Sequence, residues 1–189
     1  MKKYILLIAL AVSVLTAKAQ FNVDRLITSG KVALHYEDYV LSIQYFNQVI
    51  ALKPFLYEPW QYRAVAKFYL DDFVGAETDA SEAIALNPYI DILYDLRAIS
   101  RIRQEDYAGA IADYNKAIAI SPDTRNYWFN RAICMLNSKN YDDALAQTDS
   151  IIRKWQRFAN AYQLKAEVWL NKKDTVEAAK WLDKSLEID

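Results

Sequence analysis

The sequence contains very few of the residues that turns, disulfides and metal sites require. Its 189 residues include three glycines, four prolines, one histidine and one cysteine. Scarce turn residues and the lack of alternating apolar runs argue against a β-sheet protein and favour long helices joined by short links. Three scattered glycines are too few for a glycine-rich phosphate-binding loop. The single cysteine, Cys134, cannot form a disulfide within the chain, so stability must come from packing.

The same scarcity leaves no recognisable catalytic or metal centre. His35 has no cysteines or carboxylates around it at metal-ligand spacing, and we expect it on the surface at the end of the first helix. We expect Cys134 to be a buried, inert thiol, because nothing near it in the sequence would lower its pKa. The sequence therefore predicts a protein that is not an enzyme and has no cofactor or metal.

The first nineteen residues have the pattern of a secretory signal peptide. Lys2 and Lys3 precede an apolar run over 4–15, and Ala17, Lys18 and Ala19 form a small-residue cleavage site. The run is shorter than the roughly 20 residues that span a bilayer, so an uncleaved anchor is the weaker alternative. No cysteine follows the run, which excludes lipoprotein attachment. We expect export to the periplasm or cell envelope of a Gram-negative bacterium, and secretion otherwise.

The overall composition is that of a globular protein, with 53% hydrophobic and 25% charged residues. Removal of 1–19 leaves 20 basic and 24 acidic residues, a net charge near −4. A nucleic-acid-binding protein favours a clustered basic surface, so we predict no nucleic-acid partner. No other segment is long and apolar enough to cross a membrane, so we predict no membrane span in the mature chain.

The chain repeats itself with a period of 34 residues from Val23 to Asp189. Prolines, small residues and aromatic residues recur in separate series at this spacing: Pro54, Pro88 and Pro122; Ala64, Ala98, Ala132 and Ala166; Ala76, Ala110, Ala144 and Ala178; Trp60, Tyr94, Trp128 and Tyr162. Within 91–124, apolar residues at helical spacing predict two helices with a polar turn at 104–106 between them. A hairpin of this size has too little core to stand alone, so neighbouring repeats must pack together.

These series resemble the tetratricopeptide repeat family, whose pattern has a large residue at position 4, small residues at 8, 20 and 27, aromatics at 17 and 24, and proline at 32. The resemblance covers essentially the whole mature chain, with repeats over 23–56, 57–90, 91–124, 125–158 and 159–189. It implies an all-α solenoid of five tandem helix-turn-helix repeats, wound as a right-handed superhelix, in one domain over 20–189.

Two departures from the family pattern concern the first and fourth repeats. Ser42 stands where the other repeats have alanine, and Gln156 replaces the proline of the fourth repeat. Ile151, Ile152 and Trp155 share one helical face, so we expect the second helix of the fourth repeat to continue to a shifted end.

A series of cations occupies position 7 of the repeats: Arg63, Arg97, Arg131 and Lys165, called here the position-7 cations. One interpretation is a basic ladder that clamps acidic ligands. The other pairs the arginines with Asp79 and Asp113, which recur at position 23. We favour pairing, because bidentate arginine–carboxylate bridges suit a tight junction between helices.

In the family, positions 2, 5, 9, 12 and 13 of the first helices line a concave groove. The resemblance therefore implies a candidate groove formed by Val65, Phe68, Asp95, Ile99, Ile102, Arg103, Asn126, Phe129, Ile133, Leu136, Asn137, Asn160, Gln163, Leu170 and Asn171. An exposed apolar strip flanked by asparagines would bind an extended or helical peptide. Alternatively, the apolar residues pack within the stack and leave little exposed. The lysine and asparagine clamp of chaperone-binding members is missing, so binding of chaperone tails is not implied.

The resemblance implies a non-catalytic, exported scaffold that binds a protein or peptide through its concave face. One alternative is an assembly module of an envelope complex that uses its convex face or end-to-end stacking. Another is an accessory subunit of an exported enzyme or glycan-handling complex. The oligomeric state and the identity of the partner stay open.

Overall fold

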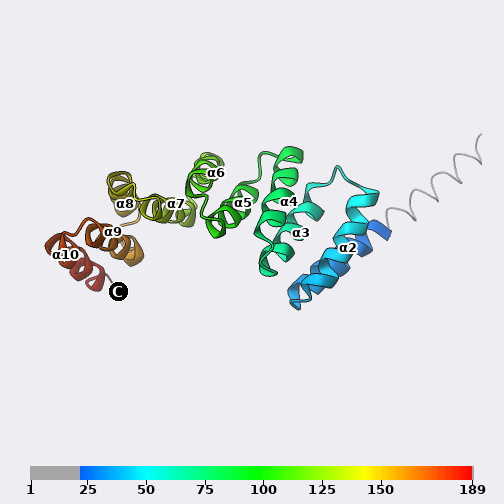
Figure 1. The fold of residues 1–189 in the computed structure, drawn as a ribbon, viewed down its shortest axis with the longest axis horizontal. Helices are drawn as coiled ribbons and strands as arrows, with labels where there is room; N and C mark the ends of the chain where they lie inside the picture. The colour runs from blue at the N-terminus through cyan, green and yellow to red at the C-terminus, as the bar shows by residue number, and fades with distance from the viewer. Residues whose placement is uncertain (1–21, 189) are drawn as a thin grey trace, which may run out of the picture. The chain divides into compact units, whose positions relative to one another are not determined.

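The computed structural model describes residues 22–188, and the elements within this range are all helices (Figure 1). The predicted signal peptide over 1–19 lies outside the described residues. A helix covers residues 22–35, and nine more follow: α2 Tyr39–Leu52, α3 Tyr57–Tyr69, α4 Phe73–Leu86, α5 Asp91–Arg103, α6 Tyr107–Ile120, α7 Arg125–Asn137, α8 Tyr141–Lys154, α9 Ala159–Asn171 and α10 Thr175–Leu186.

The chain divides into two compact units between Asn87 and Pro88. The first unit contains the helix over 22–35, α2, α3 and α4, and the second contains α5 to α10. Within each unit, helices that follow one another in the sequence pack together as hairpins. The first helices of successive hairpins begin at Tyr57, Asp91, Arg125 and Ala159, at the period of the sequence repeat. The predicted all-α fold of tandem helix hairpins is therefore confirmed.

Small residues form the contact between the two helices of each hairpin. Alanines at positions 8 and 20 are almost fully buried throughout: Ala64, Ala98, Ala132, Ala166, Ala76, Ala110, Ala144 and Ala178. The first hairpin replaces this pair by Gly30 and Ser42, whose hydroxyl donates to the Gly30 carbonyl at 3.0 Å. A Cβ on Gly30 would come within 2.8 Å of the Phe46 ring. In the first hairpin, the Phe46 ring therefore fills the space that the alanine side chain at position 8 occupies in the other hairpins.

In the second to fifth repeats, an aromatic side chain at position 4 ties the first helix to the loop before it. Trp60 Nε1 donates to the Pro54 carbonyl at 3.0 Å, and the three later aromatics repeat the contact over the same six residues: Trp128 to Pro122 at 3.0 Å, Tyr94 to Pro88 at 3.1 Å and Tyr162 to Gln156 at 2.9 Å. Tryptophan and tyrosine both carry a donor at the far edge of the ring, which explains why they alternate here.

The turn inside each hairpin has left-handed backbone at position 15. Glu37, Asp71, Glu105, Lys139 and Lys173 have φ between 60° and 65° there. The next residue is the N-cap of the second helix, and in the third hairpin this residue, Asp106, accepts from the Gly109 amide at 3.0 Å. This side chain satisfies one of the amides that a helix leaves without an intrahelical partner. The sequence indicated only a polar turn at 104–106.

The fourth hairpin differs from the prediction at the end of its second helix. α8 ends at Lys154 and is 14 residues long, the same length as α2, α4 and α6. The predicted shifted end is therefore wrong. Trp155 follows the helix and packs edge-on against Trp128, with ring centroids 6.0 Å apart. The apolar face of Ile151, Ile152 and Trp155 therefore does not indicate a longer helix, because the Trp155 ring packs on Trp128 from the position just after α8.

Replacing Ala98 by leucine tests the contact between the helices. Ala98 has no exposed surface, and three added carbons have no space between α5 and α6. Overpacking is expected to lower the free energy of unfolding by about 1–3 kcal/mol, measured by urea denaturation. Ala108→Leu, at an exposed position of α6, is the control and should change stability little. Equal stability of the two variants would contradict the assigned register.

Candidate functional site

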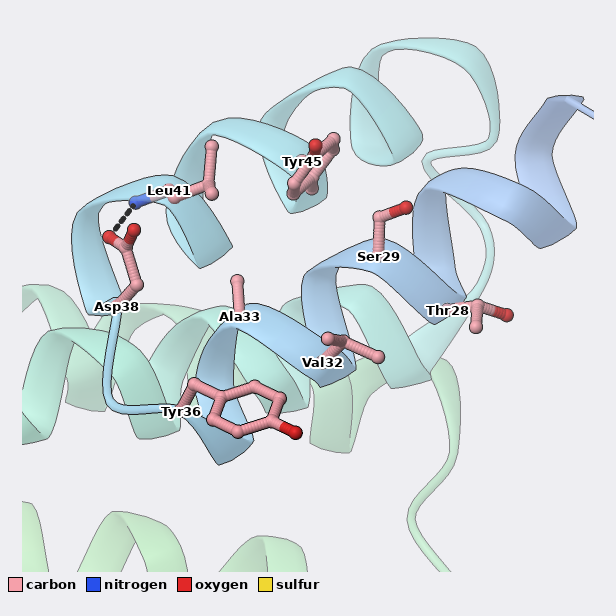
Figure 2. Close-up of a pocket in the computed structure, with 8 residues that line it drawn as sticks. All are labelled: Thr28, Ser29, Val32, Ala33, Tyr36, Asp38, Leu41 and Tyr45. Atoms are coloured by element: carbon pink, nitrogen blue, oxygen red, sulfur yellow. Dashed lines mark hydrogen bonds between the residues drawn. The ribbon is translucent and has the colours of Figure 1, made fainter.

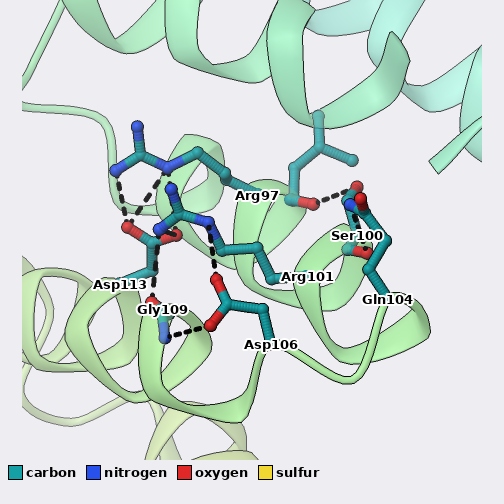
Figure 3. A network of polar contacts seen from close by, with 8 residues as sticks. Arg97, Ser100, Arg101, Gln104, Asp106, Gly109 and Asp113 are labelled. Atoms are coloured by element: carbon teal, nitrogen blue, oxygen red, sulfur yellow. Dashed lines mark hydrogen bonds and ion pairs between the residues drawn. The ribbon is translucent and has the colours of Figure 1, made fainter. Parts of the chain in front are cut away.

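The position-7 cations lie in polar networks between helices. In the third hairpin, Arg97 and Arg101 of α5 converge on Asp113 of α6 (Figure 3). Arg97 Nη2 lies 2.6 Å from Asp113 Oδ1, and Arg101 Nη1 lies 2.8 Å from Asp113 Oδ2. The Asp113 side chain is only 2% exposed, so two charge-assisted contacts compensate its burial.

The other hairpins repeat this arrangement with variations. In the second hairpin, Asp79 accepts from Arg63 at 2.7 Å and pairs with Lys67 at 2.8 Å. In the fourth, Arg131 donates to Gln147 at 2.6 Å, whereas Lys165 of the fifth hairpin pairs with Asp149 of the fourth. The predicted pairing of arginines with Asp79 and Asp113 is confirmed, and the structure shows that Arg63 pairs with Asp79 and Arg97 with Asp113, each within its own hairpin.

The candidate groove residues differ in how far they are exposed. Seven are half-buried: Val65, Phe68, Asp95, Ile99, Ile102, Phe129 and Ile133. Seven are exposed: Arg103, Asn126, Asn137, Asn160, Gln163, Leu170 and Asn171. Val65 and Phe68 belong to the first unit and the others to the second, so each group is considered within its own unit.

Leu136 is the one candidate groove residue that the structure excludes from the surface. It is 6% exposed and belongs to a core cluster with Ala144 of α8 and Leu164 and Val168 of α9. Its inclusion was therefore wrong, because the neighbouring hairpin covers this position. Position 12 alone does not decide exposure: Leu170, at the same position of the next repeat, is 49% exposed.

Aromatic packing supports the apolar part of the candidate groove in the second unit. Phe129 and Ile133 of α7 pack on the core cluster. The Phe129 ring also meets Phe158 edge-on, with centroids 5.2 Å apart, and the Arg125 guanidinium lies 4.2 Å above the Phe158 ring. Phe158 and Arg125 were not predicted as site residues. Phe129 and Ile133 are thus each partly buried in the stack and partly exposed.

A cluster of two carboxylates and two phenols lies where α5, α6 and α7 meet, and is called here the Asp95 cluster: Asp91, Asp95, Tyr114 and Tyr127. Tyr127 Oη donates to Asp91 Oδ2 at 3.1 Å. Asp95 Oδ1 and Tyr114 Oη are both buried, and Asp95 and Asn130 are the polar neighbours of the Tyr114 hydroxyl. Sequence reasoning selected Asp95 but missed the two phenols.

Burial sets the protonation behaviour of the Asp95 cluster. Loss of solvation raises the pKa of Asp95, and the charge of Asp91 raises it further. The Tyr114 hydroxyl beside Asp95 acts in the opposite direction and lowers this pKa, because a hydroxyl donor favours the ionised carboxylate. Burial also raises the pKa of Tyr114 and Tyr127, so both phenols are protonated and neutral at physiological pH.

An open surface pocket lies between the helix over 22–35 and α2 (Figure 2). Its volume is about 350 Å³, and its lining is Thr28, Ser29, Val32, Ala33, Tyr36, Asp38, Leu41 and Tyr45. Asp38 accepts from the Leu41 amide at 3.1 Å, so its carboxylate begins α2. Val32 and Tyr36 are 50% and 76% exposed, which gives this end of the first unit an apolar surface.

Cys134 and His35, the two residues considered for catalysis or metal binding, lie in ordinary buried and surface environments. Burial raises the pKa of Cys134 to about 12, so the thiol is protonated and unreactive at neutral pH. His35 is exposed at the end of the helix over 22–35, as predicted. Within residues 22–188, no group of three or more histidine, cysteine or acidic residues could hold a metal ion. The same range contains no helix that is both long and apolar enough for a membrane span.

Comparison with known proteins places these hairpins in a wider group. A family model described as tetratricopeptide repeat matches residues 101–168. A crystal structure of MamA protein is 17% identical, with a TM-score of 0.82 over 88% of this chain and 91% of that chain. MamA 41-end from Desulfovibrio magneticus RS-1 is 13% identical, with a TM-score of 0.81 over 88% and 94%. YrrB, described as a TPR protein with an unusual peptide-binding site, is 14% identical, with a TM-score of 0.76 over 87% and 84%. A comparison with curated proteins found no match.

The pairing of Asp113 can be tested by removing its charge. Asp113→Asn removes the carboxylate on which Arg97 and Arg101 converge, although Arg101 keeps Asp106 at 3.7 Å, and should lower the free energy of unfolding by about 3 kcal/mol in denaturant titrations. Asp123→Asn is the control, because the Asp123 side chain is 90% exposed beside Lys154 and should contribute less than about 1 kcal/mol. Similar losses in the two variants would contradict a structural role for the network.

The raised pKa of Asp95 predicts how stability depends on pH. Ionised Asp95 destabilises the fold at neutral pH, and protonation removes this effect as pH falls through the folded-state pKa towards the unfolded value of about 3.9. Asp95→Asn should therefore be more stable than wild type at about pH 7, with a difference that shrinks at about pH 4. Denaturation midpoints at both pH values measure this. A difference that grows on acidification would contradict the assigned environment.

Proposed function

We propose that this chain, a tetratricopeptide-repeat protein, is a non-catalytic scaffold that binds a peptide segment of a protein partner along the first helices of its second unit. Protein binding is what the repeat fold supports in general, and the assignment of the surface is the specific part of the proposal. The candidate groove residues of α7 and α9 define that surface.

The observation that carries the proposal is the combination of amides and apolar groups on α7 and α9. Asn126, Asn137, Asn160 and Asn171 are exposed at equivalent positions of successive repeats. Half-buried Phe129 lies between them in the sequence register of α7. Each amide can donate to and accept from a peptide backbone, and the ring offers apolar contact to side chains. Both needs of an extended peptide are met on one pair of helices.

Export is a further part of the proposal. The basic start, apolar run and small-residue site over 1–19 support removal of a signal peptide and a location in the periplasm or cell envelope, or secretion in an organism without an outer membrane. The partner would then be another exported protein or an exposed segment of an envelope protein.

A second candidate function is assembly by end-to-end stacking, and exposed apolar residues in the first and last described hairpins favour it. Val32 and Tyr36 are exposed at the pocket of Figure 2, and Leu186 of α10 is 73% exposed. In the other hairpins, the isoleucines equivalent to Leu186 are half-buried. Light scattering at increasing protein concentration distinguishes the two candidates, because stacking requires a mass that rises with concentration.

Variants of the candidate groove test peptide binding directly. The purified chain is immobilised, and a pool of short peptides is passed over it and quantified by mass spectrometry. Ile133→Asp should remove most retention, because it places a charge on the apolar strip. The double variant Asn137→Ala with Asn171→Ala should weaken retention without disturbing the core, since both side chains are exposed.

The control for Ile133→Asp is Ala112→Asp, which adds the same charge at an exposed position of α6. It should retain peptides as wild type does. Circular dichroism must show the same helicity for every variant. Undiminished retention by the asparagine double variant and by a folded Ile133→Asp would contradict the proposed surface.

A further inference from the structure

A surface pocket of the second unit lies between α8, α9, α10 and the loop that joins α8 to α9, and is called here the Trp181 pocket. Its volume is about 530 Å³. The apolar part of its lining is formed by Ile152, Tyr162, Trp181 and Ile188. The polar part is formed by Gln156, Arg157, Lys184 and Glu187. Small-molecule sites typically combine an apolar wall with a few polar groups in such a volume. None of these residues belongs to the candidate groove.

The Trp181 ring is held in place before any ligand arrives. Its Nε1 donates to Glu177 Oε2 at 3.1 Å. The buried Lys165 Nζ lies 3.6 Å from the ring centroid, and the Tyr162 ring lies 6.2 Å away with a tilt of 39°. Position 23 has an aspartate in the second and third hairpins, so a large ring takes the place of a carboxylate in the fifth. A wall that is already ordered loses little freedom on binding, which favours affinity.

The equivalent place one repeat earlier is filled by a side chain of the protein itself. There, Lys154 Nζ donates to the Pro122 carbonyl at 2.6 Å and pairs with Asp123 at 2.8 Å. The same ammonium lies 5.3 Å from the centroid of the Trp128 ring. The space beside the position-4 ring of the fourth hairpin therefore holds a cation, fixed by one carboxylate and one carbonyl.

The Trp181 pocket differs from this filled place at both charged positions. The residues 34 positions after Asp123 and Lys154 are Arg157 and Ile188. A guanidinium thus replaces the carboxylate, and an apolar side chain replaces the lysine that fills the space. The fifth hairpin therefore keeps the place open and presents the opposite charge at its edge.

Two cations of the Trp181 pocket have no carboxylate partner in the described part of the chain. Arg157 is exposed and forms no ion pair there, and Lys184 Nζ contacts only the Trp181 ring, 4.2 Å from its centroid. The other two lysines beside this ring are paired with carboxylates. Glu187 is the one acidic side chain of the lining. Two positive charges against one negative charge favour an anion in the pocket.

We propose that the Trp181 pocket binds a small organic acid in which a carboxylate is attached to an apolar ring. The Arg157 guanidinium can donate two parallel hydrogen bonds to the carboxylate, and the Lys184 ammonium supplies a further donor. The ring of the acid packs against Tyr162 and Trp181 in offset or edge-on contact. Glu187 disfavours a second negative charge on the ligand. The site is separate from the candidate groove, so this inference goes beyond the proposed function and does not depend on it.

Phenylacetate is the probe that tests this inference, with phenylacetamide and acetate for comparison. Phenylacetamide keeps the ring without the charge, and acetate keeps the charge without the ring. Each is titrated into the purified protein and followed by NMR at the indole N–H of Trp181, whose signal is assigned with Trp181→Phe. Phenylacetate should bind about tenfold more tightly than either of the other two. Salt at about 1 M should weaken its binding.

Arg157→Gln should weaken phenylacetate binding about tenfold and leave phenylacetamide unchanged, because it removes the charge and keeps the apolar wall. Arg153→Gln is the matched control, because Arg153 is an exposed arginine of α8 outside the pocket, and it should bind phenylacetate as wild type does. The double variant Arg157→Asp with Ile188→Lys copies the charges of the fourth hairpin. Its new ion pair should fill the pocket and abolish phenylacetate binding.

Several results would overturn the inference. Equal binding of phenylacetate and phenylacetamide would do so, as would the lack of any shift at Trp181. An affinity that Arg157→Gln leaves unchanged, or that Arg153→Gln lowers equally, would contradict the assigned site. Tighter binding of N-acetyl-glycyl-phenylalanine than of phenylacetate would overturn a free acid as the ligand and indicate the carboxyl end of a peptide. Peptide retention by the candidate groove is measured separately, so each of the two proposals can fail alone.

Discussion

The close contact between the two helices of each hairpin is the constraint on which this structure depends. Alanines such as Ala98 and Ala110 have no exposed surface, so the helices approach too closely for larger side chains. Small side chains contribute little apolar area of their own, so the hairpins also pack against neighbouring hairpins of the same unit. Charged groups that enter these contacts must be neutralised there, as Asp113 is by Arg97 and Arg101.

Much of the fold could be predicted because each hairpin carries the same local pattern. The positions of the first helices follow directly from the alanine and aromatic series, since one period contains one hairpin. The turn geometry could not be predicted, because glutamate, aspartate and lysine at position 15 give no sign of positive φ. The end of α8 was predicted wrongly because Trp155 continues an apolar face without continuing the helix.

The candidate site was less predictable, because the position of a residue in the repeat indicates which face of the helix it lies on but not how deeply it is buried. The pairing of Arg97 with Asp113 could be inferred from two series of opposite charge at the same period. The burial of Leu136 depends on Leu164 and Val168 of the next hairpin, which the position number does not describe. Likewise, the partial burial of Asp95 beside Tyr114 of α6 can be recognised only when the packing of α5 on α6 is known.

The aromatic donor at position 4 constrains the length of the loop between hairpins. Its side chain spans a fixed distance from the helix to the carbonyl six residues earlier, as in Trp60 and Tyr162. An added residue within that interval would move the carbonyl out of reach, whereas the identity of the residue that supplies the carbonyl matters little, because proline and glutamine serve equally. The reach of one side chain thus limits the length of the loop between hairpins, which agrees with the constant 34-residue period of the sequence.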